Sequence, residues 1–216
     1  MKKIAQLVIS LTAIAAVCAA VLAIVNEITR ERIASIATLK SNKAAKAVLP
    51  AGVNAIDQRK DPADEKAVIF VAYADAAKSK VLGYAAPGVS ASGYGGTIRL
   101  MVGLTADRNV VSYQVLAANE TPGLGAKLGD AAFTAQFGGK SGRTLKVKKD
   151  GGDVDAITGA TITSRAVCEA IANACARIDR LEGRAPAADP AAEAVAQPGY
   201  LVKADVLEAD GISACA

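Results

Sequence analysis

Residues 155–164, DAITGATITS, place four hydroxyl side chains around a Gly-Ala step. A pattern with helical spacing follows at once, in which Val167, Ile171 and Ile178 share one face. Hydroxyl oxygens are common at helix starts because they accept hydrogen bonds from free N–H groups. The positive dipole end of a helix also stabilises a bound anion. The segment therefore predicts a helix start, an attachment point for an anionic group, or both.

The absence of histidine limits the chemistry that this chain can perform. No histidine occurs among the 216 residues, which removes Ser-His and Cys-His nucleophile pairs and most zinc sites. The four cysteines form no C-x-x-C pair, so no metal or iron–sulfur site is expected. We expect Cys168 and Cys175 to be small core residues. The net charge of +4 is modest and the basic residues form no stripe, so nucleic acid is not expected as a partner.

Two further segments are rich in glycine. Residues 91–98, ASGYGGTI, precede a predicted strand, and residues 119–128, NETPGLGAKL, follow another. Both have a purely structural interpretation: glycine pairs before a strand often mark a bulge, and Pro122-Gly123 suits the centre of a type II turn. Each segment alone is weak support for a ligand site.

Taken together, the three segments resemble the FMN-binding domain of two membrane proteins, the G subunit of the Rnf electron-transport complex and the C subunit of the sodium-translocating NADH:quinone reductase. Asp155 and residues 158–161 fit the flavinylation pattern D-x-x-[ST]-G-A-T, and residues 93–96 and 120–125 match the segments before it. With the N-terminal anchor included, the resemblance covers most of residues 1 to about 184. The short connector before the domain is more similar to the Rnf protein.

The resemblance implies that Thr161 carries FMN through a phosphoester bond, delivered from FAD by a separate magnesium-dependent flavin transferase. A free threonine hydroxyl is a poor nucleophile and the chain has no histidine base, so the attachment chemistry is expected to lie mainly with the transferase. Asp155 is expected to act in recognition or orientation, the alternative being a turn-forming aspartate. Asn119 departs from the family, whose members often have a histidine nearby.

The resemblance also implies a set of flavin-lining residues, with no catalytic residue. Thr163 and Ser164 are explained by helix capping, and a phosphate contact would be an addition. Lys127 and Arg165 are either counter-charges for the phosphate or solvated surface residues. The cofactor-binding residues expected are Tyr94, Gly95, Gly96, Glu120, Thr121, Gly123, Leu124, Gly125, Lys127, Asp155, Thr158, Gly159, Ala160, Thr161 and Thr163.

The N-terminus predicts a membrane anchor. Residues 4–25 contain no charged residue. As a helix, a stretch of this length can cross a hydrocarbon core of about 30 Å. A cleaved signal peptide is the alternative, but its apolar region is usually only about 7–15 residues long. Basic residues after the span outnumber Lys2 and Lys3, which would leave the domain in the cytoplasm. The resemblance, and the need to retain a cofactor outside the cell, favour the opposite orientation in the inner membrane, with the FMN domain on the periplasmic side.

The fold class expected is α+β, with a single transmembrane helix followed by a domain of mainly antiparallel strands and packed helices. Strands are predicted over residues 67–74, 81–86, 97–105, 109–117 and 143–149, the third and fourth forming a hairpin. A helix is predicted from Ser164 to Leu181, capped by Thr163 or Ser164 and ended by Gly183 and Pro186. The domains expected are a cytoplasmic stub (1–3), the transmembrane helix (4–26), a connector helix ending before Pro50 (27–60), the FMN-binding domain (61–184) and an Ala/Pro-rich tail (185–216).

The function expected is that of an electron carrier with covalent FMN in an Rnf-type complex. Such a complex passes electrons between reduced ferredoxin and NAD and couples the transfer to sodium or proton translocation. The expected partners are the A, D and E membrane proteins of the complex, its soluble B and C proteins, the flavin transferase and the lipid bilayer. The alternatives are the C subunit of the quinone reductase, a separate membrane-anchored flavoprotein reductase, and a non-redox binding module in which Thr161 only starts a helix.

Overall fold

A computed structural model describes residues 2–184, so the tail expected over residues 185–216, with Pro186, lies outside the described residues. The first element, α1 (Lys2–Val48), is one continuous helix of 47 residues. At 1.5 Å per residue it is about 70 Å long, more than twice the hydrocarbon core of a bilayer. It ends two residues before Pro50, as expected from the missing N–H of proline.

The apolar stretch of α1 is exposed along its length. It is the one helix in the described part of the chain that is long and apolar enough to cross a membrane, with a mean hydropathy of 2.3. By its internal contacts the chain divides into two units, Met1–Lys43 and the chain from Ala44 onward. A helix of this length with exposed apolar side chains supports the expected membrane anchor.

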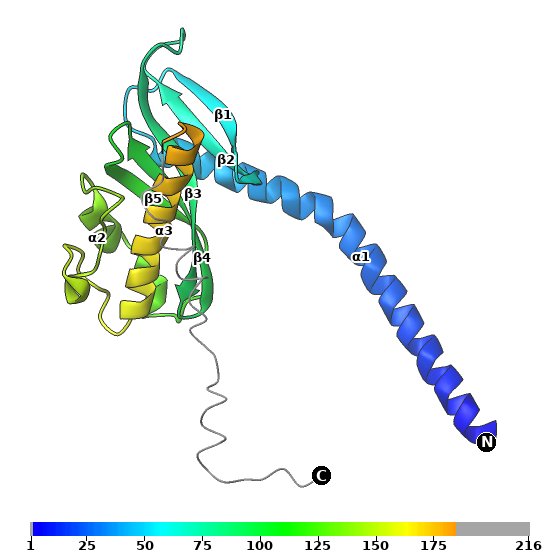
Figure 1. The fold of residues 1–216 in the computed structure, drawn as a ribbon. Helices are drawn as coiled ribbons and strands as arrows, with labels where there is room; N and C mark the ends of the chain where they lie inside the picture. The colour runs from blue at the N-terminus through cyan, green and yellow to red at the C-terminus, as the bar shows by residue number, and fades with distance from the viewer. Residues whose placement is uncertain (1, 185–216) are drawn as a thin grey trace, which may run out of the picture. The chain divides into compact units, whose positions relative to one another are not determined.

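The second unit contains a five-stranded sheet in which every neighbouring pair is antiparallel, with the strands in chain order (Figure 1). Four strands overlap those predicted, including the β4–β5 hairpin, and the antiparallel sheet with packed helices confirms the fold class. The edge strand β1 lies in the predicted connector except for its last residue, Asp61. The strands are β1 (Ala55–Asp61), β2 (Asp64–Tyr73), β3 (Val81–Gly93), β4 (Gly96–Thr105) and β5 (Val110–Ala117).

The two faces of the sheet are covered by different helices. Side chains alternate along β4, so Val102 and Leu104 point toward α3 (Thr161–Leu181), while Met101 packs against the last turn of α1 at Val48. Both helices approach the sheet closely at glycines: a Cβ on Gly88 would lie 2.1 Å from the carbonyl oxygen of Ala170. The long helix α3 therefore packs closely against the sheet.

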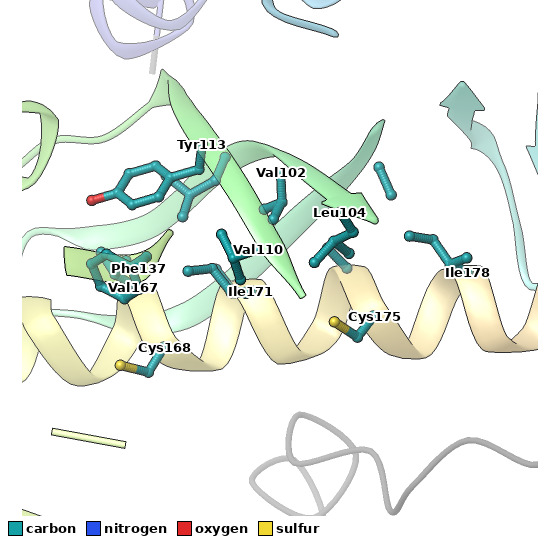
Figure 2. Close-up of a cluster of buried hydrophobic side chains, with 14 of the residues drawn as sticks. Val102, Leu104, Val110, Tyr113, Phe137, Val167, Cys168, Ile171, Cys175 and Ile178 are labelled. Carbon is teal, nitrogen blue, oxygen red and sulfur yellow. The ribbon is translucent and has the colours of Figure 1, made fainter. Parts of the chain in front are cut away.

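The core between the sheet and α3 is formed by the apolar stripe that the sequence predicted (Figure 2). Val102 and Val110 of the strands face Ile171 of the helix. Cys168 and Cys175 are buried, which confirms them as core residues, and burial raises the pKa of each thiol to about 12. They therefore stay protonated at physiological pH.

The strand predicted over residues 143–149 is wrong. This segment forms a loop with one isolated parallel bridge between Val147 and Val154, and a 3-10 turn, η3 (Lys148–Asp150). The chain curls because the backbone N–H groups of Asp150 and Gly152 both donate to the Val147 carbonyl, at 2.8 and 3.1 Å. The alternation of apolar and basic residues over 145–148 is typical of a strand, and it led to the wrong prediction. The chain instead turns back at Gly151-Gly152.

Candidate functional site

The side chain of Glu120 joins the three glycine-containing segments. Its Oε1 accepts a hydrogen bond from the Gly95 N–H at 3.2 Å, in the turn between β3 and β4. Its Oε2 accepts one from the Thr163 hydroxyl at 2.7 Å, in the first turn of α3. One carboxylate in the loop after β5 thus fixes two segments that lie 25 and 43 residues away in the sequence.

Two glycines make this junction possible. A Cβ on Gly95 would lie 1.7 Å from the carbonyl oxygen of Asn119, and one on Gly125 would lie 2.4 Å from Glu120 Oε2. Real Cβ atoms do not come this close to other atoms, so only glycine allows these backbones to approach. Between them, Gly123 has a φ of +79° and the Leu124 N–H donates to the Thr121 carbonyl at 3.2 Å. The turn expected at Pro122-Gly123 is present.

The start of α3 differs from the prediction, because neither Thr163 nor Ser164 caps it. The helix begins at Thr161, and no side chain caps its N-terminus. The Ser164 hydroxyl accepts from the Ile157 N–H and donates to the Ala160 carbonyl, both at 2.9 Å, while Thr163 is engaged by Glu120. The N–H groups of residues 161–163 consequently donate to no acceptor within the described part of the chain.

The hydroxyl of Thr161 lies at this uncapped helix end. It is half-buried and accepts a hydrogen bond from the ammonium of Lys149 at 3.3 Å. The turn just before the helix leaves little room for a side chain at Gly159. This residue has a φ of +78°, and a Cβ there would lie 3.1 Å from Leu124 Cδ2. Leu124 and Ile162 are 44% and 49% exposed, so they offer apolar surface beside Gly159 and directly after Thr161 in the chain.

Ion pairs surround the same helix start. Asp150 forms two hydrogen bonds with Arg165, both 2.7 Å long, which lower the pKa of the Asp150 carboxyl and raise that of the Arg165 guanidinium. Asp155 pairs with Lys148 at 2.8 Å. The Gln136 side chain holds the Asp155 backbone by accepting from its N–H at 2.7 Å and donating to its carbonyl at 3.1 Å.

The remaining expected residues surround this centre less directly. Tyr94 is exposed at the tip of the β3–β4 turn, and Gly96 beside it has a φ of +110°. Thr158 is exposed in the turn before the helix. Lys127 is exposed in η1 (Gly125–Gly129) and forms no ion pair within the described residues, and no contact joins it to Thr161.

Three residues at the site were not identified from the sequence: Lys149, Gln136 and Ile162. The basic run KVKKD, just upstream of the D-x-x-T-G-A-T segment, indicated that a lysine could lie near the site. Lys149 was not proposed because this run was predicted to be a strand. Gln136 gave no signal, because its contact with Asp155 depends on how the two loops pack.

The arrangement suits a group with an anionic end and an aromatic body. Open N–H groups and the Lys149 ammonium can hold one phosphate on the Thr161 hydroxyl, since both favour negative charge. Leu124 and Ile162 offer a neighbouring apolar surface to a ring. Among residues 2–184 there is no group of three or more Asp, Glu, Cys or His that could hold a metal ion.

Comparison with known families agrees with this geometry. The FMN-binding domain family matches residues 93–176, from the β3–β4 turn to the third quarter of α3. The matched range contains residues 93–98 of the first glycine-containing segment, the whole of the other two, and Thr161. The expectation of FMN as the cofactor is thereby supported.

Relatives with similar sequences belong to ion-translocating complexes. The G subunit of the ion-translocating oxidoreductase complex of Methanosarcina acetivorans is 31% identical over 185 residues, which cover 84% of this chain and 98% of the relative. The G subunit of the Na(+)-translocating ferredoxin:NAD(+) oxidoreductase complex of Acetobacterium woodii is also 31% identical, over 79% of this chain and 89% of the relative. The G subunit of the proton-translocating ferredoxin:NAD(+) oxidoreductase complex of Clostridium ljungdahlii is 39% identical, but the match spans only 51% of this chain and 61% of the relative.

Among solved structures, the C subunit of the Na(+)-translocating NADH-quinone reductase of Parabacteroides distasonis is similar to part of the chain. The two are 28% identical with a TM-score of 0.43, over 53% of this chain and 61% of that one. Family membership is shown by the match to the Methanosarcina protein, which covers nearly all of that relative. The chain belongs to the family of G subunits of ion-translocating oxidoreductase complexes, which is the Rnf family that its glycine-containing segments predicted.

Proposed function

We propose that this chain is the membrane-anchored electron-carrying subunit of an Rnf-type ferredoxin:NAD oxidoreductase, with FMN esterified through its phosphate to Thr161. The observation that carries the proposal is the uncapped start of α3, where the Thr161 hydroxyl lies beside a lysine in a D-x-x-T-G-A-T segment. A phosphodiester keeps one negative charge, which the open N–H groups and the helix dipole stabilise.

The residues of the site divide the work of holding the cofactor. Glu120 fixes the loop after β5 to the helix start and to the β3–β4 turn, and Leu124 of this loop lies beside Gly159, two residues before Thr161. Leu124 and Ile162 would pack against the apolar part of the ring system, and the polar groups of residues 120–125 would bond its edge. The bound flavin supplies the redox chemistry, and the protein sets its position and polarity.

The expected partners follow from this assignment. The chain would act with the A, D and E membrane proteins of the complex and with its soluble B and C proteins, and a flavin transferase would attach the cofactor. Electron transfer between ferredoxin and NAD would be coupled to sodium or proton translocation. The relatives from Acetobacterium and Clostridium are named for complexes of these two kinds.

The attachment site is tested by replacing its single acceptor. After co-expression with a flavin transferase, the wild-type chain is expected to fluoresce under ultraviolet light in a denaturing gel, and the Thr161→Val chain is not. Thr161→Ser keeps a hydroxyl and should retain fluorescence. Mass spectrometry of the peptide should show the added mass of FMN less one water. Fluorescence of Thr161→Val at the wild-type level, or none from the wild type, would refute the assignment.

We place the FMN domain on the periplasmic side, with the N-terminus in the cytoplasm. Covalent attachment supports this side, because a cofactor lost there could not be rebound from a cytosolic pool. The basic residues that follow the span favour the other side. A protease site inserted after Ala77, in the exposed loop between β2 and β3, should be cut by protease added to intact spheroplasts. Cleavage only after lysis would place the domain in the cytoplasm.

A further inference from the structure

We propose that Lys149 is a positioning residue that holds the flavin phosphate at the Thr161 hydroxyl, first during attachment and then in the finished phosphodiester. This inference depends on the proposed attachment of FMN to Thr161. It rests on the 3.3 Å hydrogen bond between the two side chains and on the loop that presents the lysine.

The loop that carries Lys149, residues 146–154, is fixed at both ends. The Lys148 N–H donates to the Val154 carbonyl at 2.8 Å, and the Val154 N–H donates to the Lys146 carbonyl at 3.2 Å. The side chains of Val147 and Val154 are buried in the core. At the tip, Gly151 has a φ of +80°, and a Cβ on Gly152 would lie 2.1 Å from the Lys146 carbonyl oxygen. The tight glycine turn therefore gives Lys149 a defined position.

The tip of the loop is also tied to the helix that carries the acceptor. Asp150 binds Arg165 through two hydrogen bonds, and Arg165 lies four residues after Thr161 in α3. Residues four apart lie on the same face of a helix, so this pair brings the loop tip over the first turn. Lys149 precedes Asp150 and reaches the hydroxyl on that face.

Among the described residues, Lys149 is the cation whose side chain contacts the Thr161 hydroxyl. Arg165 is paired with Asp150 and Lys148 with Asp155, whereas Lys149 forms no ion pair among the described residues. A phosphodiester on Thr161 adds one negative charge beside this ammonium. Arg165, a counter-charge that the sequence suggested, is already engaged by a carboxylate.

The attachment step defines what the lysine does. The Thr161 oxygen attacks the phosphorus on the riboflavin side of FAD, forming a new O–P bond. The pyrophosphate P–O bond breaks, AMP leaves with the electron pair, and the hydroxyl proton passes to a base of the transferase. The Lys149 ammonium donates to a non-bridging phosphate oxygen, and this charge-assisted hydrogen bond aligns the phosphorus with the hydroxyl.

The test compares two substitutions in one loop with purified full-length chain, transferase, FAD and Mg²⁺. Lys149→Gln is expected to slow flavin incorporation by about tenfold or more, as for loss of a hydrogen bond to a charged group. Lys146→Gln removes the same charge from an exposed position and should stay within about twofold of the wild-type rate. Lys149→Arg keeps the charge and should restore most of the rate.

Two readouts separate positioning from a structural role. Added salt should slow the wild type and Lys146→Gln more than Lys149→Gln, because the screened attraction is missing in the latter. The unmodified variants should melt at the same temperature as the wild type. If the wild type is labelled and Lys149→Gln is labelled at the same rate, this inference fails and the attachment site stands. If the wild type is not labelled, the proposed function itself fails.

Discussion

Replacement of Arg108 by alanine is expected to lower the free energy of unfolding by about 3–5 kcal/mol, the range for breaking a buried ion pair from one side. The side chain is 1% exposed. Its Nε donates to Asp179 Oδ1 at 2.9 Å, its Nη2 to Glu182 Oε2 at 2.5 Å, and its guanidinium stacks 4.9 Å from the centre of the Tyr84 ring. Alanine would leave the buried Asp179 and the partly buried Glu182, at the C-terminal end of α3, without the donor that they share.

Denaturant unfolding of the full chain in detergent, followed by circular dichroism, measures this loss. Arg143→Ala is the matched control, because Arg143 also binds Asp179, at 2.7 Å, but is 37% exposed and less desolvated. We expect it to cost about 1 kcal/mol, as for an exposed pair. Equal losses for the two substitutions would mean that burial of Arg108 does not set the energy of the network.

The same network predicts how the loss of unfolding free energy in Arg108→Ala depends on pH. Burial alone would raise the pKa of Glu182, but hydrogen bonds from Tyr84 and Arg108 lower it below its ordinary value. A carboxyl whose pKa is lower in the folded state stabilises the fold above its unfolded pKa, about 4.3, and loses that contribution as the pH falls through the folded value. The difference in free energy of unfolding between wild type and Arg108→Ala should therefore become smaller under acid conditions.

Regular elements of this fold were predictable wherever one face is buried. The helical stripe that includes Ile171 and Ile178, and the alternating strand that includes Val102 and Leu104, are visible in the sequence because burial selects apolar residues at each period. The edge strand β1 was missed, since its sequence, AIDQRKD, lies mostly exposed and carries charges on both faces. Its pairing with β2 makes it a strand, and no local pattern records that pairing.

Buried polar contacts were less predictable, because their partners are distant in the sequence. Arg108 occupies a short turn between strands, where a charged residue normally indicates solvent, yet its partner Asp179 lies 71 residues away. The three glycine-containing segments of the proposed flavin site stand out in the sequence and resemble a family, whereas the Glu120 contacts that join them became visible only in the fold. The loop carrying Lys149 was misassigned for a related reason, since its backbone hydrogen bonds lie within the loop and not in the sheet.

Replacement of Gly125 by alanine is expected to slow covalent flavin incorporation by about tenfold or more, the effect of misplacing a reacting group by a fraction of an ångström to an ångström. The added Cβ would lie 2.4 Å from Glu120 Oε2 and 2.8 Å from Thr163 Oγ1, so it enters the hydrogen bond between them. Gly125 does not have a positive φ, so the cause is the contact and not backbone strain. Displacement of Glu120 also frees the Gly95 turn, which the same carboxylate holds.

Gly129→Ala provides the matched control, because Gly129 ends the same short helix, η1. A Cβ there would meet only Val115 Cγ2 at 3.6 Å, an ordinary contact, and incorporation should stay within about twofold of wild type. The labelling rate, from fluorescence in denaturing gels, and the melting temperature of the unmodified chain are measured for both variants. Loss of labelling in Gly129→Ala as well would indicate that η1 tolerates no side chain, and would remove the specific role given to Glu120.

A double substitution shows whether the clash with Glu120 is the cause. Glu120→Ala alone should slow incorporation, since the loop after β5 then loses its links to Thr163 and Gly95. In the Glu120→Ala background the space beside Gly125 is open, so adding Gly125→Ala should slow the reaction little further. Residues that act through one contact show such non-additive effects. If the two losses in incorporation rate are fully additive, Gly125→Ala does not act through Glu120. The contact between the glycine loop and the start of α3 would then not explain its effect.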